Sequence, residues 1–402
     1  MSTQSAHVIV GVDTHADTHH VAVIDTNGTR IADAKFLTTL AGLAALVAFV
    51  RSHGTVIRVG VEGTGSYGAG LSRYLRDEGF TVVEVIRPNR QVRRMRGKSD
   101  PIDAYEAART ALAEPDLPTP KTADGNVEAI RALLVARRSA IKARTAAQTQ
   151  IKSLLVTAPT LVRERFRGLT DKKLLPALSA LRPSRSGDEQ AAAMLTALRS
   201  LARRHAYLSE EIADLDQLLN VLVSEVSPAL RAAKGVGTVT AAQLLVTAGD
   251  NPERLRSEAS FAALCGVSPI PASSGKTNRH RLNRGGDRQA NSALHQIVLS
   301  RMTYDSRTRD YVARKRAEGR GAKEAMRCLK RAVAREVFRH LTRPEPVPVV
   351  NDLRPLRLKA GLRLSDVAER FGCWPMKVST IERGVSRDDE FAAAYREWLI
   401  SA

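Results

Sequence analysis

The sequence predicts an α/β domain at the N-terminus that is followed by mainly α-helical regions. In residues 1–122, short runs of β-branched and apolar residues alternate with segments of helical spacing. From Asn126 onward, apolar residues recur mostly every three or four positions between charges, which is the spacing of amphipathic helices. Three early strands with hairpin character, followed by strand–helix alternation, predict a mixed sheet with flanking helices.

The N-terminal domain, residues 1–122, contains the predicted strands. We expect them at residues 7–12, 19–25, 30–36, 56–61 and 81–86. A tight turn, Thr26-Asn27-Gly28, joins the second and third strands. Helices are expected at residues 40–50, 67–77 and 101–113, and a basic loop, residues 87–98, precedes the last of them. Three prolines mark the end of the domain: Pro115, Pro118 and Pro120.

Residues 123–227 form a helical connector. Long amphipathic helices are expected at residues 126–156 and 189–226, separated by a stretch that contains Pro and Gly, residues 159–187. The two helices form either a coiled-coil-like antiparallel hairpin within one chain or a coiled coil that dimerises. The sequence favours neither arrangement over the other.

Residues 228–342 form a third region. Its segment AKGVGTVTAAQLL, residues 233–245, matches a helix-hairpin-helix turn, in which glycines free backbone amides to hold a DNA phosphate. A plain glycine-rich connection between helices fits the same residues equally well. A loop rich in Pro, Ser and basic residues, 269–286, then leads into basic helices at residues 288–302 and 320–340.

The C-terminal part has the features of a separate module. Residues 343–352 contain PEPVP and predict a semi-rigid linker. In residues 353–402, helices at 364–371 and 375–383 flank a turn at Gly372-Cys373, which are the proportions of a helix-turn-helix. The segment resembles the helix-turn-helix of phage-repressor-type DNA-binding domains. The alternative is a helical module that contacts protein.

The composition favours a nucleic acid as partner. Lys and Arg number 62 against 42 Asp and Glu, a net charge of +20, which favours a polyanion. Aromatic residues make up only 4%, so base stacking is not the expected main binding device. The cysteines Cys265, Cys328 and Cys373 lack the spacing of a zinc finger or a disulfide framework. Without a signal peptide or a membrane-spanning apolar run, we expect a soluble cytoplasmic protein.

Four acidic residues stand out by their positions. Asp13 and Glu62 each close a predicted strand, whereas Asp100 and Asp103 lie one turn apart at a helix start. Carboxylates gathered in one place repel each other unless cations neutralise them. Two Mg²⁺ ions would do so, and would also clamp the attacking and leaving oxygens of a phosphodiester. Three of the acids also have a structural alternative: a turn cap for Asp13, an arginine partner for Glu62 and a helix cap for Asp100.

The motifs around these acids resemble those of a known family. VGVDTH, VEGTGSYG and KSDPIDA are similar to the DEDD motifs of insertion-sequence transposases with a RuvC-like, RNase H-fold nuclease domain. GVGTVTAAQLL and FAALCGVSPIPASSGKTNRHRLNRGG resemble the second conserved domain of that family, so the resemblance reaches about His340. It implies that Asp13, Glu62, Asp100 and Asp103 bind metal. It also implies guidance by a bridge RNA that the element encodes, and an active site formed between protomers of a homo-oligomer, a dimer or tetramer.

A serine in the second domain matches the nucleophile of this family. By the resemblance, the position is Ser274, directly before Gly275, and the adjacent Ser273 stays an alternative. Without the family, the same residues form an ordinary turn sequence. A serine hydroxyl needs a base or a metal to become nucleophilic at neutral pH, and the metal ions of the acidic domain would supply this activation. The product would be a covalent protein–DNA phosphoester that conserves the bond energy for rejoining.

Basic residues accompany each of these features and are predicted to contact nucleic acid. In the loop before Asp100 they are Arg87, Arg90, Arg93, Arg94, Arg96 and Lys98. Beside the serine they are Lys276, Arg279, Arg281 and Arg284. On the predicted recognition helix the contact residues are Lys377, Ser379 and Arg383. A further basic face follows the helices between residues 314 and 335. For the loop before Asp100, the alternative is a plain solvated loop.

Together these features favour a metal-dependent, serine-using DNA transposase or recombinase that is guided by an element-encoded RNA. One alternative is a RuvC-like endonuclease of Holliday junctions, in which water attacks and no covalent adduct forms. Another is a non-catalytic DNA-binding regulator that uses the helix-turn-helix. The four acids argue against a regulator, and Ser274 with its domain argues against simple hydrolysis.

Overall fold

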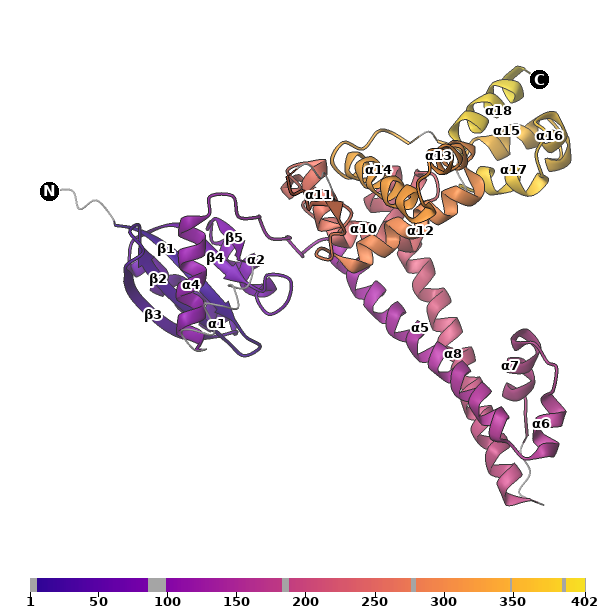
Figure 1. Cartoon of the computed structure of the whole chain (residues 1–402), viewed down its shortest axis with the longest axis horizontal. Coiled ribbons are helices and arrows are strands. Elements are labelled where there is room, and N and C mark those ends of the chain that lie inside the picture. Colours follow the sequence, from indigo (N-terminus) through magenta and orange to yellow (C-terminus); the bar gives the residue numbers. More distant parts are fainter. Residues whose placement is uncertain are drawn as a thin grey trace. The chain divides into compact units, whose positions relative to one another are not determined.

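The computed structural model describes residues 6–85, 99–182, 188–275, 280–347, 349–384 and 388–401. They belong to two compact units, which are Met1–Glu128 with Ala248–Phe261, and Ala129–Thr247 with Ala262–Ala402 (Figure 1). The first contains a mixed α/β sheet, and the second consists mostly of helices. The prediction of an α/β domain followed by mainly helical regions is therefore confirmed at this level.

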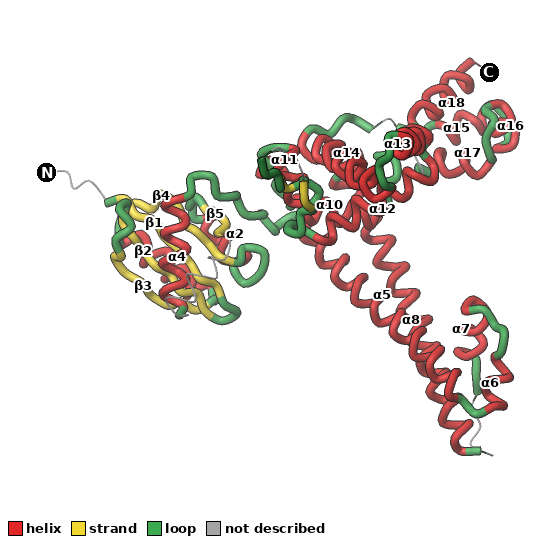
Figure 2. The backbone as a smooth tube through the Cα atoms, viewed as in Figure 1, coloured by secondary structure: helices red, strands yellow, loops and turns green. Residues whose placement is uncertain are grey.

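The N-terminal sheet has five strands in the order β3-β2-β1-β4-β5 (Figure 2). They are β1 His7–Thr14, β2 Thr18–Asp25, β3 Arg30–Leu37, β4 Thr55–Glu62 and β5 Val82–Val85. The first three strands pair antiparallel as a meander, and β4 and β5 continue the sheet in parallel on the other side of β1. The sheet is thus mixed, as the alternation of strand and helix signals predicts.

Helices cover both faces of this sheet. Helices α1 Leu40–Ser52 and α2 Ala69–Asp77 pack on one face, against Val8, Val10 and Val12 of β1. Helix α4 Asp100–Ala113 packs on the other face, over Ile9. Because alternate residues of β1 point to opposite faces, this single strand contributes to both hydrophobic cores. No described helix in the protein is long and apolar enough to cross a membrane.

Two glycines let α4 approach the sheet closely. Gly11 of β1 and Gly60 of β4 are paired neighbours in the sheet. A Cβ atom on Gly11 would lie 2.1 Å from the backbone nitrogen of Ala108 and 2.2 Å from the carbonyl oxygen of Ala104. A Cβ atom on Gly60 would lie 2.8 Å from the Cβ of Ala111. Only glycine fits at these two positions, so the pair determines how near the helix lies to the strand ends.

A segment from far along the chain completes the first unit. The buried side chain of Asn251 donates to the carbonyl oxygen of Pro120 and accepts from the backbone nitrogen of Thr122. Arg256 forms an ion pair with Asp116 at 2.9 Å. Two short elements flank Arg256 in the sequence: η1 Pro252–Arg254 and α11 Glu258–Leu264. No local sequence pattern predicts this long-range packing.

Long helices dominate the second unit. They are α5 Asn126–Thr157 and α8 Glu189–Val226, with α6 Thr160–Phe166 and α7 Asp171–Ser179 between them. Arg137 of α5 pairs with Asp216 of α8, while Ile151, further along α5, packs with Leu198 and Ala202. A residue later in α5 thus contacts residues earlier in α8, so α5 and α8 form an antiparallel hairpin within one chain. Dimerisation through this hairpin stays a prediction.

A helical cluster follows the hairpin. Its elements are α9 Pro228–Ala232, α10 Thr238–Ala248, α12 Arg288–Tyr304, α13 Ser306–Ala317 and α14 Ala322–Thr342, with strands β6 Ile270–Pro271 and β7 His280–Arg281. Arg301 of α12 donates to both carboxylate oxygens of Glu336 in α14 at 2.7 Å, and to the carbonyl oxygen of Lys234. This guanidinium therefore ties two helices to the glycine-containing turn before α10.

Four helices form the C-terminal module. They are α15 Leu353–Lys359, α16 Leu364–Arg370, α17 Pro375–Glu382 and α18 Asp389–Ser401. They enclose their own hydrophobic core, within which the guanidinium of Arg357 binds both carboxylate oxygens of Glu382. The hydroxyl of Tyr395 donates to the same carboxylate. Helices α16 and α17 lie where the sequence predicts the two helices of a helix-turn-helix.

Candidate active site

Two of the predicted acids lie at the ends of neighbouring strands. The register of the parallel strands β1 and β4 pairs Val12 with Val61, so Asp13 and Glu62 follow side by side at the same edge of the sheet. The hydroxyl of Thr14 donates to the carbonyl oxygen of Glu62 at 2.8 Å and ties the two strand ends together. Both acids are largely buried, at 7% and 8% exposure.

The first turn of α4 supplies the other two acids. Ser99 precedes the helix in an extended conformation, and its carbonyl oxygen accepts from the backbone nitrogen of Asp103. Pro101 suits the first turn because its fixed φ is helical and its missing N–H has no partner to lose there. Asp103 is 3% exposed, whereas the side chain of Asp100 is 37% exposed.

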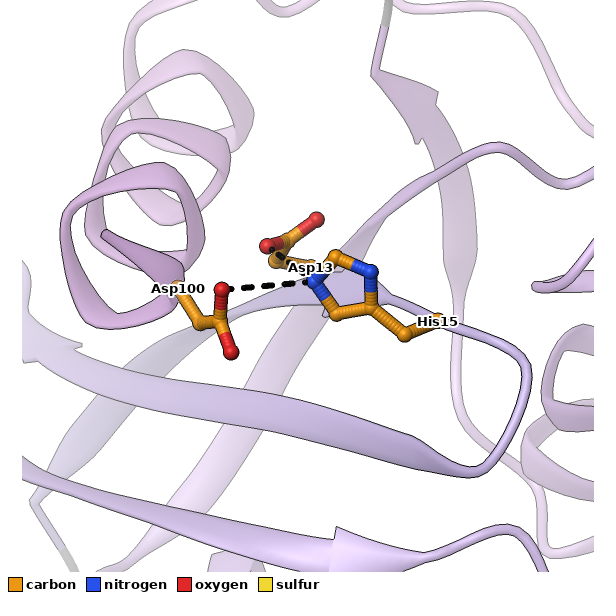
Figure 3. Close-up of side chains that lie close together, drawn as sticks. All are labelled: Asp13, His15 and Asp100. Atoms are coloured by element: carbon orange, nitrogen blue, oxygen red, sulfur yellow. Dashed lines mark hydrogen bonds and ion pairs between the residues drawn. The ribbon is translucent and has the colours of Figure 1, made fainter. Parts of the chain in front are cut away.

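A histidine links an acid of the strand to an acid of the helix (Figure 3). The Nε2 atom of His15 lies 3.1 Å from Oδ2 of Asp13 and 3.4 Å from Oδ1 of Asp100. The other carboxylate oxygen of Asp100 lies 3.7 Å from the ammonium group of Lys35 in β3. Asp13 and Asp100 are 87 residues apart in sequence but meet across one imidazole ring.

The neighbouring charges perturb the carboxyl group of Asp13. Burial raises the pKa of the Asp13 carboxyl, and the charges of Asp103 and Asp100 raise it further, whereas His15 acts in the opposite direction. The carboxylates of α4 therefore lie near enough to repel the carboxylate at the end of β1. A bound cation would relieve both the burial cost and this repulsion.

The donor set fits a divalent cation. Ligand atoms of Asp13, His15 and Asp100 all lie within 4.8 Å of one another. Carboxylate oxygens are the protein ligands of Mg²⁺, and mixed carboxylate and imidazole sets hold transition metals. The structure thus brings Asp13 and Asp100 into one site and places Asp103 beside it. Glu62 ends the strand next to Asp13.

His15 and Lys35 lie at the site although the sequence motifs did not predict them. His15 is contained in the quoted motif VGVDTH, two residues after Asp13, and residues two apart in an extended segment share a face. That spacing is a signal that could have identified the histidine. Lys35 gave no such signal, because it reaches the site only through the antiparallel register of β2 and β3, which pairs it with His20.

The predicted nucleophile belongs to the second unit. Ser274 is exposed on the connection between β6 and β7, where Pro271 pairs with His280. It directly precedes Gly275, whose φ of +55° lies in the left-handed region that favours glycine. Ser273 is exposed as well.

A basic cavity of about 860 Å³ lies beside this hairpin, within the second unit. Backbone and side chains of residues 266–269 and 280–283 form one wall, and α14 forms another. The cationic residues that line it are Arg281, Arg320, Arg327, Lys330 and Arg331. Burial and the charge of Arg327 lower the pKa of Lys330, whose ammonium donates to Asn291 at 2.8 Å. Of the contacts predicted beside the serine, Arg281 lines the cavity and Arg284 is exposed.

The predicted recognition helix, α17, carries its contact residues in different settings. Lys377 pairs with Asp388 at 2.9 Å and lies over the ring of Phe391. Arg383 is exposed, and its Nε donates to the carbonyl oxygen of Ser379. The predicted contacts that lie outside the described residues are Arg87, Arg90, Arg93, Arg94, Arg96, Lys98, Lys276 and Arg279.

Comparison with known proteins points to one family. A family model described as a transposase, of the DEDD type of IS110, matches residues 10–158, which include all four acids. A second model, described as the transposase IS116/IS110/IS902 family, matches residues 227–313, which include Ser274. The two matches together span more than half of the chain.

A curated relative agrees with the family models. It is the "Insertion element IS110 uncharacterized 43.6 kDa protein" of Streptomyces coelicolor, 34% identical over 130 residues. The match covers 32% of either chain, so this protein spans about a third of the length of that relative. With both domain models of the family matched in order along the sequence, the chain belongs to the IS110 family of transposases.

Proposed function

We propose that this protein is the DNA transposase or recombinase of an insertion sequence, and that it cleaves and rejoins DNA strands. The observation that carries the proposal is the meeting of acids from the ends of β1 and β4 and from the first turn of α4. Asp13 and Asp100 share His15, Asp103 raises the pKa of Asp13, and Glu62 ends the adjacent strand.

These acids would hold divalent metal, in our proposal two Mg²⁺ ions. Asp13, Glu62, Asp100 and Asp103 are the ligands that we assign. A metal pair at such a site lowers the pKa of a bound hydroxyl and polarises the phosphate under attack. The burial of Asp13 supports this role. Burial destabilises the charged form of its carboxyl group and raises its pKa, and a bound cation would stabilise that charged form.

Ser274 is the proposed nucleophile. Its hydroxyl oxygen would bond to the scissile phosphorus while the bond to the departing sugar oxygen breaks and that oxygen takes a proton. The phosphoester formed keeps the bond energy, so the reverse attack by a new sugar hydroxyl rejoins DNA without ATP. Exposure of Ser274 on a hairpin suits attack on a bulky substrate.

A homo-oligomer would supply the serine and the acids to one site. The α5–α8 hairpin supports this, because large apolar side chains on it are exposed. Val135, Leu218 and Val221 are each more than half exposed, and Tyr207 is 68% exposed. Where such side chains form a contiguous patch, they suit a surface that another protomer covers. We therefore propose that protomers associate through this hairpin as a dimer or tetramer.

Nucleic acid would contact several basic surfaces. The cavity beside the serine hairpin carries four arginines and a lysine, which suits the phosphates of the DNA strand presented to Ser274. The basic loop before Asp100 and the residues beside the serine extend this role. We propose that an element-encoded RNA supplies sequence choice by base pairing, since aromatic stacking residues are few.

The C-terminal module is proposed to bind duplex DNA as a helix-turn-helix. Helices α16 and α17 support this through their length and the turn between them, where Gly372 has a φ of +59°. Arg383 and Ser379 would contact the groove or its phosphates. Lys377 would contact a DNA phosphate by exchanging its ion pair with Asp388 for one with the phosphate.

Strand cleavage by the purified protein tests this function. DNA that spans the element ends is incubated with Mg²⁺, and with RNA transcribed from the element. The wild type should release cleaved strands and become covalently attached to DNA, whereas Asp13→Asn should do neither. Ser274→Ala should bind DNA but form no adduct, and Ser273→Ala serves as the matched control. Metal-dependent cleavage without any adduct would identify the RuvC-like endonuclease instead.

A further inference from the structure

We propose that His15 is a direct metal ligand together with Asp13 and Asp100, and that its imidazole makes the site prefer Mn²⁺ over Mg²⁺. The inference rests on the proposed function only in that both require a cation at this edge of the sheet. It adds a residue outside the four acids and a consequence for metal choice.

The contact of His15 with the two acids depends on the backbone turn and on the side-chain interactions, not on burial. Its side chain is 43% exposed, so packing does not force the ring against the two carboxylates. The backbone nitrogen of His15 donates to the carbonyl oxygen of Thr18 at 3.0 Å, which closes the turn between β1 and β2. The turn therefore fixes the backbone from which the imidazole reaches Asp13 and Asp100.

The geometry suits ligation through Nε2. This atom faces both carboxylates, at 3.1 and 3.4 Å from their nearest oxygens. All three ligand atoms lie within 4.8 Å of one another, a separation that a single ion can span with bonds of about 2.0–2.2 Å after small side-chain movements. With Nε2 as the ligand, Nδ1 keeps the hydrogen of a neutral imidazole.

The chemistry of the imidazole determines the metal preference. Mg²⁺ is a hard cation that takes oxygen ligands and keeps much of its water, so carboxylates alone serve it well. Imidazole nitrogen is a softer donor, and transition metals gain more from it than Mg²⁺ does. One nitrogen ligand beside two carboxylates should therefore shift the site toward Mn²⁺.

The test measures metal binding by the full-length protein without DNA. Electron paramagnetic resonance of free Mn²⁺ gives its dissociation constant, and competition gives that of Mg²⁺. The test variants are His15→Ala, which removes the ligand, and His15→Gln, which replaces nitrogen by an amide oxygen. The matched control is His7→Ala, because His7 is an exposed histidine at the start of β1, far from the strand end that precedes His15. Asp13→Asn reports on the site as a whole, and circular dichroism checks the folding of each variant.

The inference predicts three results. The wild type binds Mn²⁺ with electron spin echo modulation from a coordinated nitrogen, and His15→Ala loses this modulation. His15→Ala weakens Mn²⁺ binding by about tenfold or more, with a much smaller change for Mg²⁺. His15→Gln keeps Mg²⁺ binding but loses the preference for Mn²⁺, and His7→Ala behaves as the wild type.

Other results separate the two proposals. If Asp13→Asn removes Mn²⁺ binding but the wild type shows no nitrogen modulation, or His15→Ala keeps the wild-type preference, the role of His15 is overturned and the metal site stands. If the wild type binds Mn²⁺ no better than Asp13→Asn, the proposed metal site itself fails, and the inference about His15 fails with it.

Discussion

Replacing Gly11 by alanine tests whether the close approach of α4 to β1 positions the acids. The new Cβ atom would lie 2.1 Å from the backbone nitrogen of Ala108, whereas ordinary contact begins at 3.4 Å. The two nearest atoms, the backbone nitrogen of Ala108 and the carbonyl oxygen of Ala104, belong to the backbone, so no side chain can move aside. Helix α4 therefore has to withdraw by about 1.3 Å, which is the difference between 2.1 and 3.4 Å. Asp100 and Asp103 would move away from Asp13 with it.

The expected effects follow from this displacement. Forcing a methyl group into a packed interface costs about 1–3 kcal/mol of stability. A misplacement of roughly 1 Å at catalytic groups costs about 100-fold in rate. We therefore expect Gly11→Ala to lower the melting temperature of the N-terminal unit modestly, and to reduce Mn²⁺ affinity and adduct formation strongly. Thermal unfolding, metal titration and a gel assay of the adduct measure these three quantities.

Gly70→Ala is the matched control in the same unit. Gly70 is exposed in helix α2, and a Cβ atom there would meet nothing within 4 Å. Alanine should stabilise the helix by up to about 1 kcal/mol and leave metal binding unchanged. If Gly11→Ala melts, binds metal and reacts as Gly70→Ala does, the contact between α4 and β1 does not position the site.

Three further predictions concern the second unit. Glu382→Ala should destabilise the C-terminal module by about 3–5 kcal/mol, because the buried guanidinium of Arg357 loses its carboxylate, and hydrogen exchange in α15–α18 measures the loss. Burial opposes ionisation of Glu336, but hydrogen bonds from His340 and Arg301 outweigh it and lower its pKa to about 2. The ionised Glu336 carboxylate therefore contributes roughly 3 kcal/mol to the free energy of unfolding, fully above about pH 4.5 and no longer as the pH falls toward 2. The difference in unfolding free energy between wild type and Glu336→Gln should shrink over that range. Ending the chain at Val347 should weaken binding to duplex DNA but spare strand cleavage, as footprinting and the cleavage assay report.

Each of these has a clear opposite result. Unchanged hydrogen exchange in Glu382→Ala would mean that the buried ion pair contributes nothing to the module. A difference between wild type and Glu336→Gln that stays constant from pH 5 to 2.5 would contradict the lowered pKa. An identical footprint after truncation would count against DNA binding by the C-terminal helix-turn-helix.

The N-terminal sheet was predictable because its signals are local. Each strand shows its β-branched runs, and the turn at residues 26–28 joins two of them. The side-by-side placement of Asp13 and Glu62 follows once their strands are neighbours in parallel, since equivalent ends then meet at one edge. Local patterning also located the long helices α5 and α8, whose apolar spacing extends over many turns.

Other features depend on register and distant packing, which local patterns do not encode. Lys35 reaches Asp100 only because β2 and β3 pair in one particular register. Asn251 gives no local sign that it would bind the backbone at residues 120 and 122. The basic cavity needs two loop segments and one helix to come together, so composition indicated its charge but not its place.

The most direct test of the account is to locate the covalent bond between protein and DNA. After reaction with Mg²⁺, the adduct is digested with nuclease and protease, and the peptide that carries a nucleotide remnant is sequenced by mass spectrometry. We expect a remnant on Ser274, present in the wild type and absent in Asp13→Asn. Cleaved DNA with no nucleotide on any serine would contradict it, as would an adduct that forms equally well without Asp13.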